Sequence, residues 1–530
     1  MSAHHPSTNS RDTPEQEDKD LEKTPYHANT QDNMKSDTQP SSDSESTAIS
    51  KSKEKDLEHG AEDHKTTTDP NLIDWDENDP ANPLNWSTAK VWCNLGIISF
   101  FRFLTPLASS MMAPVTNLIL EDFKTNDQTI GSFVVSIYIL GYALGPMVLA
   151  PLSEIYGRLP IYHINSALFV IWNMACALSP NINALLVFRL FAGLAGSCPV
   201  TNGNGSIADC VPREKRGKVT AIFTAGPLLG PVFGPIVGGF LGEGAGWRWI
   251  FWLLTIVSGV GTLISFCLQH ETYAPILLER RVQKLKQETG NEKLHHKHSN
   301  NLTKPEIFRR AIARPLTMLF TSPIVALTSV YAGLVYGYTY LLFTSFERAF
   351  ESIYNFSNRL VGLTYLGFGI GCAIGLYTIG ALSDRLVMHY SKGTEWKPEY
   401  RLLPLLPGSL IVPIGLLWYG WSAEAHTHWI VPIIGTAFVG LGTLAIFMPV
   451  QSYLIDAFTL YASSAAAANT IFRSMLGAFL PLAGPSLYAA LGQGWGNTLL
   501  AGIALAFTPM AWVIFRFGER IRKGYPGRVK

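Results

Sequence analysis

The chain has 530 residues, of which only 15% are charged, well below the roughly 25% that is typical of soluble domains. Its 41 basic and 40 acidic side chains give a net charge of +1, which argues against a nucleic-acid-binding protein with a strongly basic face. The six cysteines show no CxxC spacing and lie mostly in apolar runs, so neither a disulfide framework nor a zinc site is indicated.

The N-terminal part of the chain, residues 1–88, differs from everything that follows. Residues 1–70 are rich in Ser, Thr, Asp, Glu, Lys and His and contain almost no Val, Ile or Phe. Such a segment cannot bury enough apolar surface to offset its chain entropy, which predicts a disordered tail that is either simply solvated or a site of Ser/Thr phosphorylation. No apolar run follows Met1, so a secretory signal is not indicated.

Twelve apolar stretches follow the tail. A bilayer core about 30 Å thick requires about 20 apolar residues for each helix that crosses it. A soluble all-helical protein would need polar faces on most of its helices, and these stretches lack them. The sequence therefore predicts an all-α membrane protein with twelve spans, at 91–113, 130–150, 160–178, 182–208, 217–242, 248–268, 316–346, 359–383, 402–421, 428–456, 464–491 and 495–517.

Basic residues in the loops predict the orientation of the spans. They are concentrated in the loop between the fourth and fifth spans, in the loop between the eighth and ninth, in the segment 269–315 and in the C-terminal tail. We therefore expect both termini in the cytosol. Asn355 begins an Asn-Phe-Ser sequence that would then lie outside and could carry a glycan, whereas the similar sequence at Asn301 would be cytosolic and unmodified.

An internal repeat divides the chain into two halves. The sequence Ala150-Pro-Leu-Ser-Glu154 leaves the second span, and Gly380-Ala-Leu-Ser-Asp384 leaves the eighth. A twofold repeat of six spans is the architecture of many secondary transporters. The expected organisation is a disordered cytosolic tail (1–88), a six-helix bundle (89–268), a cytosolic linker loop (269–315), a second six-helix bundle (316–517) and a basic cytosolic tail (518–530).

The turn between the second and third spans contains the first candidate site. Glu154, Gly157 and Arg158 lie within five residues, where an acid can pair with a cation or a helix end, and where glycine permits a positive φ. This turn is either a charged latch that gates two conformations or an ordinary polar loop. Asp384 and Arg385 repeat the pattern in the second half and favour the latch.

A second candidate is Arg189 in the fourth span. An arginine inside a membrane helix costs at least about 2.5 kcal/mol, so its side chain should face the bundle interior and find a partner or water. A fixed cation there could lower the pKa of a nearby acid and affect proton exchange. The alternative is that the side chain reaches the membrane surface, which is about two turns away.

The fifth span contains three Gly-Pro pairs at four-residue spacing, a pattern that places a smooth stripe on one helix face. The stripe permits close packing, and each proline removes a donor and permits bending. It therefore predicts either a pliable gating helix or simply a bent packing helix. The residues are Gly226, Pro227, Gly230, Pro231, Gly234, Pro235, Gly238 and Gly239.

Charged and aromatic residues in other spans suggest a solute-binding cavity. Arg102 lies near the middle of the first span, and Arg473 lies in the eleventh. Glu347 follows an aromatic run in the seventh span that includes Tyr336 and Tyr340. Aromatic walls with one acid would suit bulky, apolar or cationic solutes, although the same run could instead be an interfacial belt that faces lipid.

Taken together, these motifs resemble the fungal drug:proton antiporters of the major facilitator superfamily, in the twelve-span group. The resemblance covers residues 75–525 or so and rests on motifs spread along the chain: Asp79-Pro-Ala-Asn-Pro83-Leu-Asn-Trp86, Ala150 to Arg158, Arg189 with Gly193, Gly226 to Gly239, Arg473 with Gly477, and Trp495-Gly496.

The resemblance implies two pseudo-symmetric six-helix bundles around a central cavity, with alternating access driven by the proton gradient. It implies that Glu154 and Arg158 form the cytosolic gating motif, that Arg189 takes part in proton coupling, and that Gly226 to Gly239 is the antiporter signature. The copy at Asp384 lacks the Gly-Arg that follows Glu154, so a second latch would be weaker. Members of the group export drugs, polyamines or secondary metabolites, often conferring multidrug resistance.

The expected function is therefore proton-coupled efflux of amphipathic organic compounds. A nutrient or polyamine symporter of the same fold is the alternative, and the Gly-Pro stripe favours export. No HExxH, GxSxG or phosphate-loop motif indicates an enzyme or an ATP-driven pump, and we expect no catalytic residue, cofactor or metal. The expected partners are a small organic substrate, protons and the lipid bilayer, with no nucleic acid. We expect a monomer in the plasma membrane, although the sequence does not distinguish this membrane from the vacuolar one.

Overall fold

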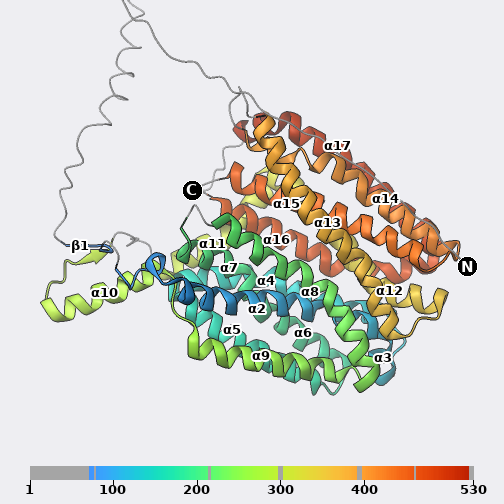
Figure 1. Ribbon diagram of the computed structural model, residues 1–530, viewed down its shortest axis with the longest axis horizontal. Coiled ribbons are helices and arrows are strands. Elements are labelled where there is room, and N and C mark those ends of the chain that lie inside the picture. The colour runs from blue at the N-terminus through green and yellow to red at the C-terminus, as the bar shows by residue number, and fades with distance from the viewer. Residues whose placement is uncertain are drawn as a thin grey trace, which may run out of the picture. The chain divides into compact units, whose positions relative to one another are not determined.

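The first half of the chain folds into long helices that follow the first six predicted spans (Figure 1). The fourth crossing consists of two helices that meet at Ser197. The elements are η1 (Pro83–Asn85), α2 (Thr88–Ser110), η2 (Ala113–Val115), α3 (Thr116–Asp122), α4 (Gln128–Tyr156), α5 (Arg158–Ala177), α6 (Ile182–Gly196), α7 (Cys198–Cys210), α8 (Arg216–Ala245) and α9 (Arg248–Leu268).

The second half contains the remaining crossings. Its last helix is kinked at Gly492, where φ is 69°, so the part before the kink completes the eleventh crossing and the part after it forms the twelfth. Glu424 accepts hydrogen bonds from the N–H groups of Gln493 (2.8 Å) and Gly494 (3.1 Å) and so caps the second part. The elements are α12 (Pro323–Tyr354), α13 (Asn358–Tyr390), η3 (Pro398–Leu402), α14 (Leu405–Glu424), α15 (Ile430–Ala457), α16 (Ala462–Phe479), η5 (Leu480–Ala483) and α17 (Gly484–Gly524).

This computed structural model describes residues 71–76, 79–212, 216–296, 303–390, 397–458 and 461–524, all within the unit Asp69–Lys530. The disordered tail predicted for residues 1–70 lies outside this part of the chain, as do residues 525–530 of the predicted basic tail. Most of the remaining residues of the predicted N-terminal tail are described by the structure and include regular elements. Residues 71–76 and 79–88 include a short strand, β1 (Leu72–Ile73), which pairs with a strand of the linker, and η1, which packs against α7.

The linker between the halves is folded rather than the simple loop that its polarity predicted. It contains α10 (Ala274–Thr289), β2 (His295–His296) and the first part of α11 (Lys304–Thr321). The linker helix α10 is amphipathic, with Leu278 and Val282 buried four residues apart on one face. The predicted seventh span, 316–346, is divided at Ser322, because Ser322 is extended and Pro323 begins a new helix.

The N-terminal segment holds the linker by a strand pair and by charge. β1 pairs in parallel with β2, next to α10 (Figure 1). Arg281 of α10 forms ion pairs with Asp79 (2.5 Å) and Asp76 (2.9 Å). A hydrogen bond from the N–H of Ala81, together with the Arg281 guanidinium, holds the pKa of the Asp79 carboxyl below its usual range. These contacts connect the start of the linker to the segment that leads into α2.

The long helices have the apolar character needed to cross a membrane. Among the described residues, nine stretches are long and apolar enough, and one of them, Ala462–Arg522, contains the Gly492 kink and hence two crossings. With α5 and α8, these stretches account for the twelve predicted crossings. Figure 1 shows the helices of the first half, coloured blue to yellow-green, lying beside the orange and red helices of the second.

Several pairs of elements join the halves, and the most extensive contacts are those of α4 with α16 and of α8 with α13. The glycine stripe of α8 faces α2, where a Cβ on Gly230 would lie only 2.8 Å from the Leu107 nitrogen and a Cβ on Gly238 would overlap the carbonyl oxygen of Met111. The Ser110 hydroxyl also donates to the carbonyl oxygen of Pro231 (3.2 Å). The stripe thus permits the close approach of α8 to α2 that the sequence suggested.

Gly238→Ala should lower the apparent melting temperature of the protein in detergent micelles. The added methyl group would force α8 away from the backbone of α2, and overpacking of this kind typically costs about 1–3 kcal/mol. Gly244→Ala is the matched control, because a Cβ at Gly244 of the same helix meets open space. Equal melting temperatures for the two variants would contradict the close packing of α8 on α2.

Candidate functional site

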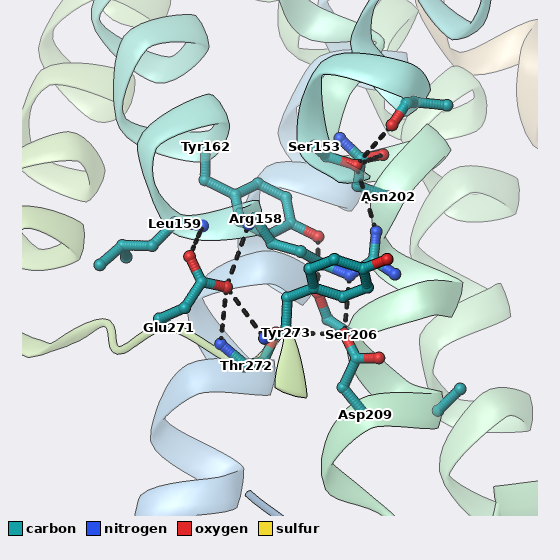
Figure 2. Close-up of polar contacts among 12 residues, drawn as sticks. Ser153, Arg158, Leu159, Tyr162, Asn202, Ser206, Asp209, Glu271, Thr272 and Tyr273 are labelled. Atoms are coloured by element: carbon teal, nitrogen blue, oxygen red, sulfur yellow. Dashed lines mark hydrogen bonds and ion pairs between the residues drawn. The ribbon is translucent and has the colours of Figure 1, made fainter. Parts of the chain in front are cut away.

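A polar network surrounds Arg158 at the turn between α4 and α5 (Figure 2). The Arg158 guanidinium donates from Nε to Oδ2 of Asp209 in α7 (2.7 Å) and from Nη1 to the Ser153 hydroxyl (3.2 Å). The ring of Tyr273 lies 5.0 Å from the guanidinium carbon. The side chains of Arg158 and Asp209 are only 11% and 17% exposed, so this ion pair is largely shielded from solvent.

Glu271, the third residue after α9, caps the first turn of α5. Its carboxylate accepts hydrogen bonds from the N–H groups of Arg158 (3.0 Å) and Leu159 (3.1 Å). It also accepts from the N–H groups of Thr272 and Tyr273 in its own loop, and it is only 5% exposed. A carboxylate at a helix N-terminus satisfies donors that have no partner within the helix and interacts favourably with the helix dipole. Glu271 therefore fixes the linker to the α4–α5 turn.

Gly157 allows this close approach of Glu271. Its φ of 95° lies in a region that other residues rarely adopt, and a Cβ there would overlap the Glu271 carboxylate. The positive φ that the sequence suggested at Gly157 is thus present, and it serves the contact with Glu271.

The α7 helix supplies much of the polar surface around Arg158. Asn202 accepts a hydrogen bond from the Ser153 hydroxyl (3.1 Å), and Ser206 bonds the Tyr162 hydroxyl (2.9 Å). A Cβ on Gly205 would overlap the Arg158 guanidinium, so only glycine leaves room for it. The α7 helix thus provides Asp209, Asn202 and Ser206 as polar partners at the α4–α5 turn, and Gly205 leaves room for the Arg158 side chain.

The sequence suggested that Glu154 could pair with a cation or a helix end, and between described residues it forms no direct ion pair with Arg158. Glu154 is exposed, and Arg158 turns to Asp209, whose carboxylate lies inside the bundle. Glu154 lies within electrostatic reach of Arg158 and, more weakly, of Arg314 in α11, which belongs to the segment leading into the second half. In the repeat, Arg385 is exposed, and the side chain of Asp384 lies outside the described side chains.

Arg189 lies inside the first bundle and does not reach the membrane surface. It is only 1% exposed, and its guanidinium donates to the carbonyl oxygens of Val134 (2.6 Å, from Nε) and Ser109 (3.2 Å, from Nη2). The rings of Tyr138 and Phe251 lie 5.2 and 5.8 Å from its guanidinium carbon. Arg189 thus connects α6 to the backbones of α4 and α2, and its hydrogen bonds in the described chain go to main-chain oxygens.

Aromatic rings and a cation meet midway along the second-half helices. The Arg473 guanidinium carbon of α16 lies 4.9 Å from the ring centroid of Tyr336 in α12 and 5.2 Å from that of Phe447 in α15. Tyr336 also packs against Tyr340 (5.0 Å between centroids), whose hydroxyl bonds that of Ser109 in the first half (3.0 Å). The structure thus brings three of the predicted cavity residues, Tyr336, Tyr340 and Arg473, into one cluster.

Arg102, another cation predicted for the cavity, lies in α2 of the first half. It is buried, and its Nη1 donates to the side-chain oxygen of Asn204 in α7 (3.0 Å). Its Nε is buried without a hydrogen-bond partner among the described residues. In addition to Arg189, the first bundle therefore contains a second buried arginine, and only part of its hydrogen-bonding capacity is used.

Glu347, the acid predicted to line the cavity, lies at the opposite end of the helices from Arg158. It is 2% exposed and accepts a hydrogen bond from the N–H of Asn117, in the first turn of α3 (3.0 Å). Asn117 donates its side-chain amide to Glu351 (2.7 Å), and Arg348 donates to the Ser132 hydroxyl (3.3 Å). We call these contacts the Glu347 seal, because each joins the second half to the first.

Asn355, the predicted glycan acceptor, ends α12 just beyond this seal. It has the left-handed conformation (φ 53°) at the C-cap, and the residue is exposed. An exposed asparagine in a turn is accessible to modification.

Comparison with known proteins identifies the family. The model of the Major Facilitator Superfamily matches residues 98–481. The chain belongs to the major facilitator superfamily. It is 52% identical to the MFS-type transporter tndD of Aspergillus flavipes over 87% of each chain. It is 45% identical to the efflux pump radE of Floropilus chiversii over 86% of this chain and 85% of that one.

A solved structure confirms the fold. The xylose transporter XylE from E. coli, in a partially occluded inward open conformation, is similar with a TM-score of 0.59 and 13% identity, over 81% of this chain and 98% of that one. The predicted family and fold class are confirmed, and the chain is a multi-pass membrane transporter of small molecules rather than an enzyme.

The sequence predicted part of this site and missed the rest. It identified Arg158 and Arg189 as candidates, but it did not identify Asp209, 51 residues away, as the partner of Arg158. It gave no role to Glu271, although an acid directly after a span and next to a tight turn is a possible helix cap. The alternating Asn and Gly residues of 202–205, unusual in an apolar span, were the available signal for a polar face on α7.

Asp209→Asn should destabilise the protein markedly. Loss of one partner from a buried ion pair typically costs about 3–5 kcal/mol, and the partial exposure of this pair reduces the expected loss to about 2–3 kcal/mol. Asp122→Asn is the matched control, because Asp122 pairs with Arg248 at 43% and 40% exposure, where a surface pair contributes less than about 1 kcal/mol. Chemical unfolding in micelles would compare them. If both variants unfold alike, Asp209 does not hold Arg158 as described.

Proposed function

We propose that this transporter is a proton-coupled efflux antiporter that exports amphipathic organic compounds from the cytosol by alternating access. The observation that carries the proposal is the Glu347 seal, which joins the two halves by hydrogen bonds at one end. The proposal places this transporter in the plasma membrane as a monomer, with both termini in the cytosol and Asn355 outside as a glycan acceptor.

The seal supports alternating access because its contacts cross between the halves. Glu347 and Arg348 of α12 bond Asn117 and Ser132 of the first half. The Glu351–Asn117 bond completes the seal, and between described residues the other hydrogen bonds and ion pairs that join the halves are those of Tyr340 with Ser109 and of Arg359 with Glu243. All of them lie in the middle of the helices or toward the Glu347 end. With cytosolic termini, the closed end is the outer one, and solute would enter from the cytosol.

Glu347 supports proton coupling through its position. In the sealed state it is buried and accepts a backbone N–H, so it cannot exchange protons freely with the external solution. Opening of the outer end would separate α12 from α3 and expose the carboxylate to external protons. The ionisable groups that interact with it are Glu351 and Arg348 on its own helix and Tyr365 on α13, and the groups of α3 that bond it are those of Thr116 and Asn117.

Other groups would set the geometry of the two states. Arg189, for which the resemblance implies a role in coupling, holds α2 and α4 together next to Ser109, the partner of Tyr340. At the other end, the Arg158 network and Glu154 would take part in closing the cytosolic side. The Gly226 to Gly239 stripe would let α8 slide or bend against α2 as the halves rock.

The relatives favour export over import. A relative covering most of the chain is named an efflux pump, which supports outward transport here. The main alternative is a proton-coupled nutrient or polyamine symporter of the same fold. The similarity to a xylose transporter does not favour this symporter alternative, because a similarity at 13% identity indicates the fold but not the function.

Reconstituted into liposomes, the full chain should accumulate an amphipathic fluorescent solute when the lumen is acidified, because protons leave the lumen in exchange. A panel of anionic, neutral and cationic dyes of similar size serves as the probe. Symport would require the opposite gradient, and a protonophore should abolish uptake. Uptake driven only by an acidic exterior, or unaffected by the protonophore, would refute antiport.

Glu347→Gln should reduce gradient-driven uptake to the level of empty liposomes, because an amide cannot release a proton at this position. Solute exchange without a gradient should persist in this variant. Glu351→Gln is the matched control, since Glu351 bonds the same Asn117 but is exposed. A Glu347→Gln protein that still responds fully to the gradient would show that Glu347 does not carry the coupled proton.

A further inference from the structure

Arg473 is a cation between the helices that lacks an acidic partner. No described ion pair involves it, and its Nε is buried without a hydrogen-bond partner. Its contacts are the rings of Tyr336 and Phe447, which come from two other helices. A cation inside a membrane protein costs at least about 2.5 kcal/mol, so an arginine kept there with unused donors indicates that something else supplies the counter-charge.

The surroundings of Arg473 add an unused acceptor and two accessible rings. Asn469, four residues earlier on the same face of α16, is buried, and its side-chain oxygen has no hydrogen-bond partner among the described residues. Tyr336, Phe447 and Arg473 are each half-buried, so part of every member of the cluster remains accessible. The cluster thus offers a guanidinium, an amide and two aromatic faces.

This accessible part faces the space between the halves. A Cβ on Gly477, one turn beyond Arg473, would touch the Tyr336 ring and would lie 3.4 Å from Ile139 of the first half. Tyr340, one turn beyond Tyr336, bonds Ser109 of the first half. The cluster therefore borders the junction of α12 and α16 with α2 and α4, where a solute would bind during alternating access.

The acids among the described residues that join the halves, Glu347, Glu351 and Glu243, are engaged in contacts away from Arg473. Arg102 of the first half also has a buried Nε with no described partner. The acid predicted for the cavity, Glu347, is engaged in the seal, and Asp209 and Glu271 are engaged at the Arg158 turn. A cationic solute would therefore be repelled here, whereas an anion would find both a partner for Arg473 and flat rings on which to stack.

We propose that Arg473, Tyr336, Phe447 and Asn469 form a subsite for a planar organic acid, with its carboxylate, enolate or phenolate on Arg473 and its conjugated ring stacked on the accessible side of the Tyr336–Phe447 pair, whose centroids lie 5.8 Å apart. This assignment rests on the proposed export function and gives the substrate class of the same cavity. It differs from the bulky, apolar or cationic solutes that aromatic walls with Glu347 in the cavity suggested from the sequence.

Three probes of one shape would test the charge preference: anthracene-9-carboxylate, anthracene-9-carboxamide and anthracen-9-ylmethylammonium. Each is titrated by fluorescence into the full-length protein in lipid nanodiscs, with empty discs subtracted for partition into lipid. The carboxylate should bind at least about tenfold more tightly than the amide, as expected for a hydrogen bond to a charged group, and the ammonium more weakly still. Equal affinities for the three probes would overturn the proposal.

Arg473→Gln should weaken binding of the carboxylate by about tenfold and leave binding of the amide unchanged, since only the charge-assisted bonds are lost. Arg473→Lys, which keeps the charge, should retain part of the preference, and Arg248→Gln, at an exposed arginine, should behave as wild type. Loss of amide binding in Arg473→Gln would indicate a structural role and contradict the subsite. Binding is measured without a gradient, so failure here leaves proton-coupled export intact, and failure of gradient-driven transport leaves the subsite intact.

Discussion

A charge that lies between membrane-spanning helices must find its partner inside the protein, because lipid provides none. This transporter meets the requirement in three ways. Arg158 pairs with a carboxylate, Arg189 donates to main-chain carbonyl oxygens, and Arg473 packs against aromatic faces. The first two arrangements hold helices together within one bundle. The third leaves hydrogen-bonding capacity unused, which is why it suits a ligand rather than a structural contact.

Carboxylates at helix N-termini recur through the structure. Glu271 caps α5, Glu347 caps α3, Glu424 caps the second part of α17, and Glu243 accepts the N–H of Arg359 at the start of α13. In each case the acid comes from a different element and satisfies N–H groups that have no partner within the helix. Two of these caps, those of Glu347 and Glu243, cross between the halves. The same kind of helix cap therefore stabilises the α4–α5 turn in the case of Glu271 and the contact between the halves in the case of Glu347.

The sequence was a good guide to the helices, because hydropathy and length alone reveal an apolar span. It erred where apolar sequence continued through a break, as at Ser322 before Pro323, and where a polar segment folded on another, as α10 did with Asp76 and Asp79. For the site it identified the cations but not their partners. The partner of Arg158 is 51 residues away and the cap of α5 is 113 residues away, and one sequence contains no record of such pairings.

Some partners would stay hidden even in a large family comparison. Glu347 accepts the main-chain N–H of Asn117, and Arg189 donates to the main-chain oxygens of Val134 and Ser109. A main-chain N–H is present in every amino acid except proline, so position 117 can drift in evolution without loss of its bond to Glu347. Such contacts leave no trace of correlated substitution, and the acid or arginine alone would look invariant.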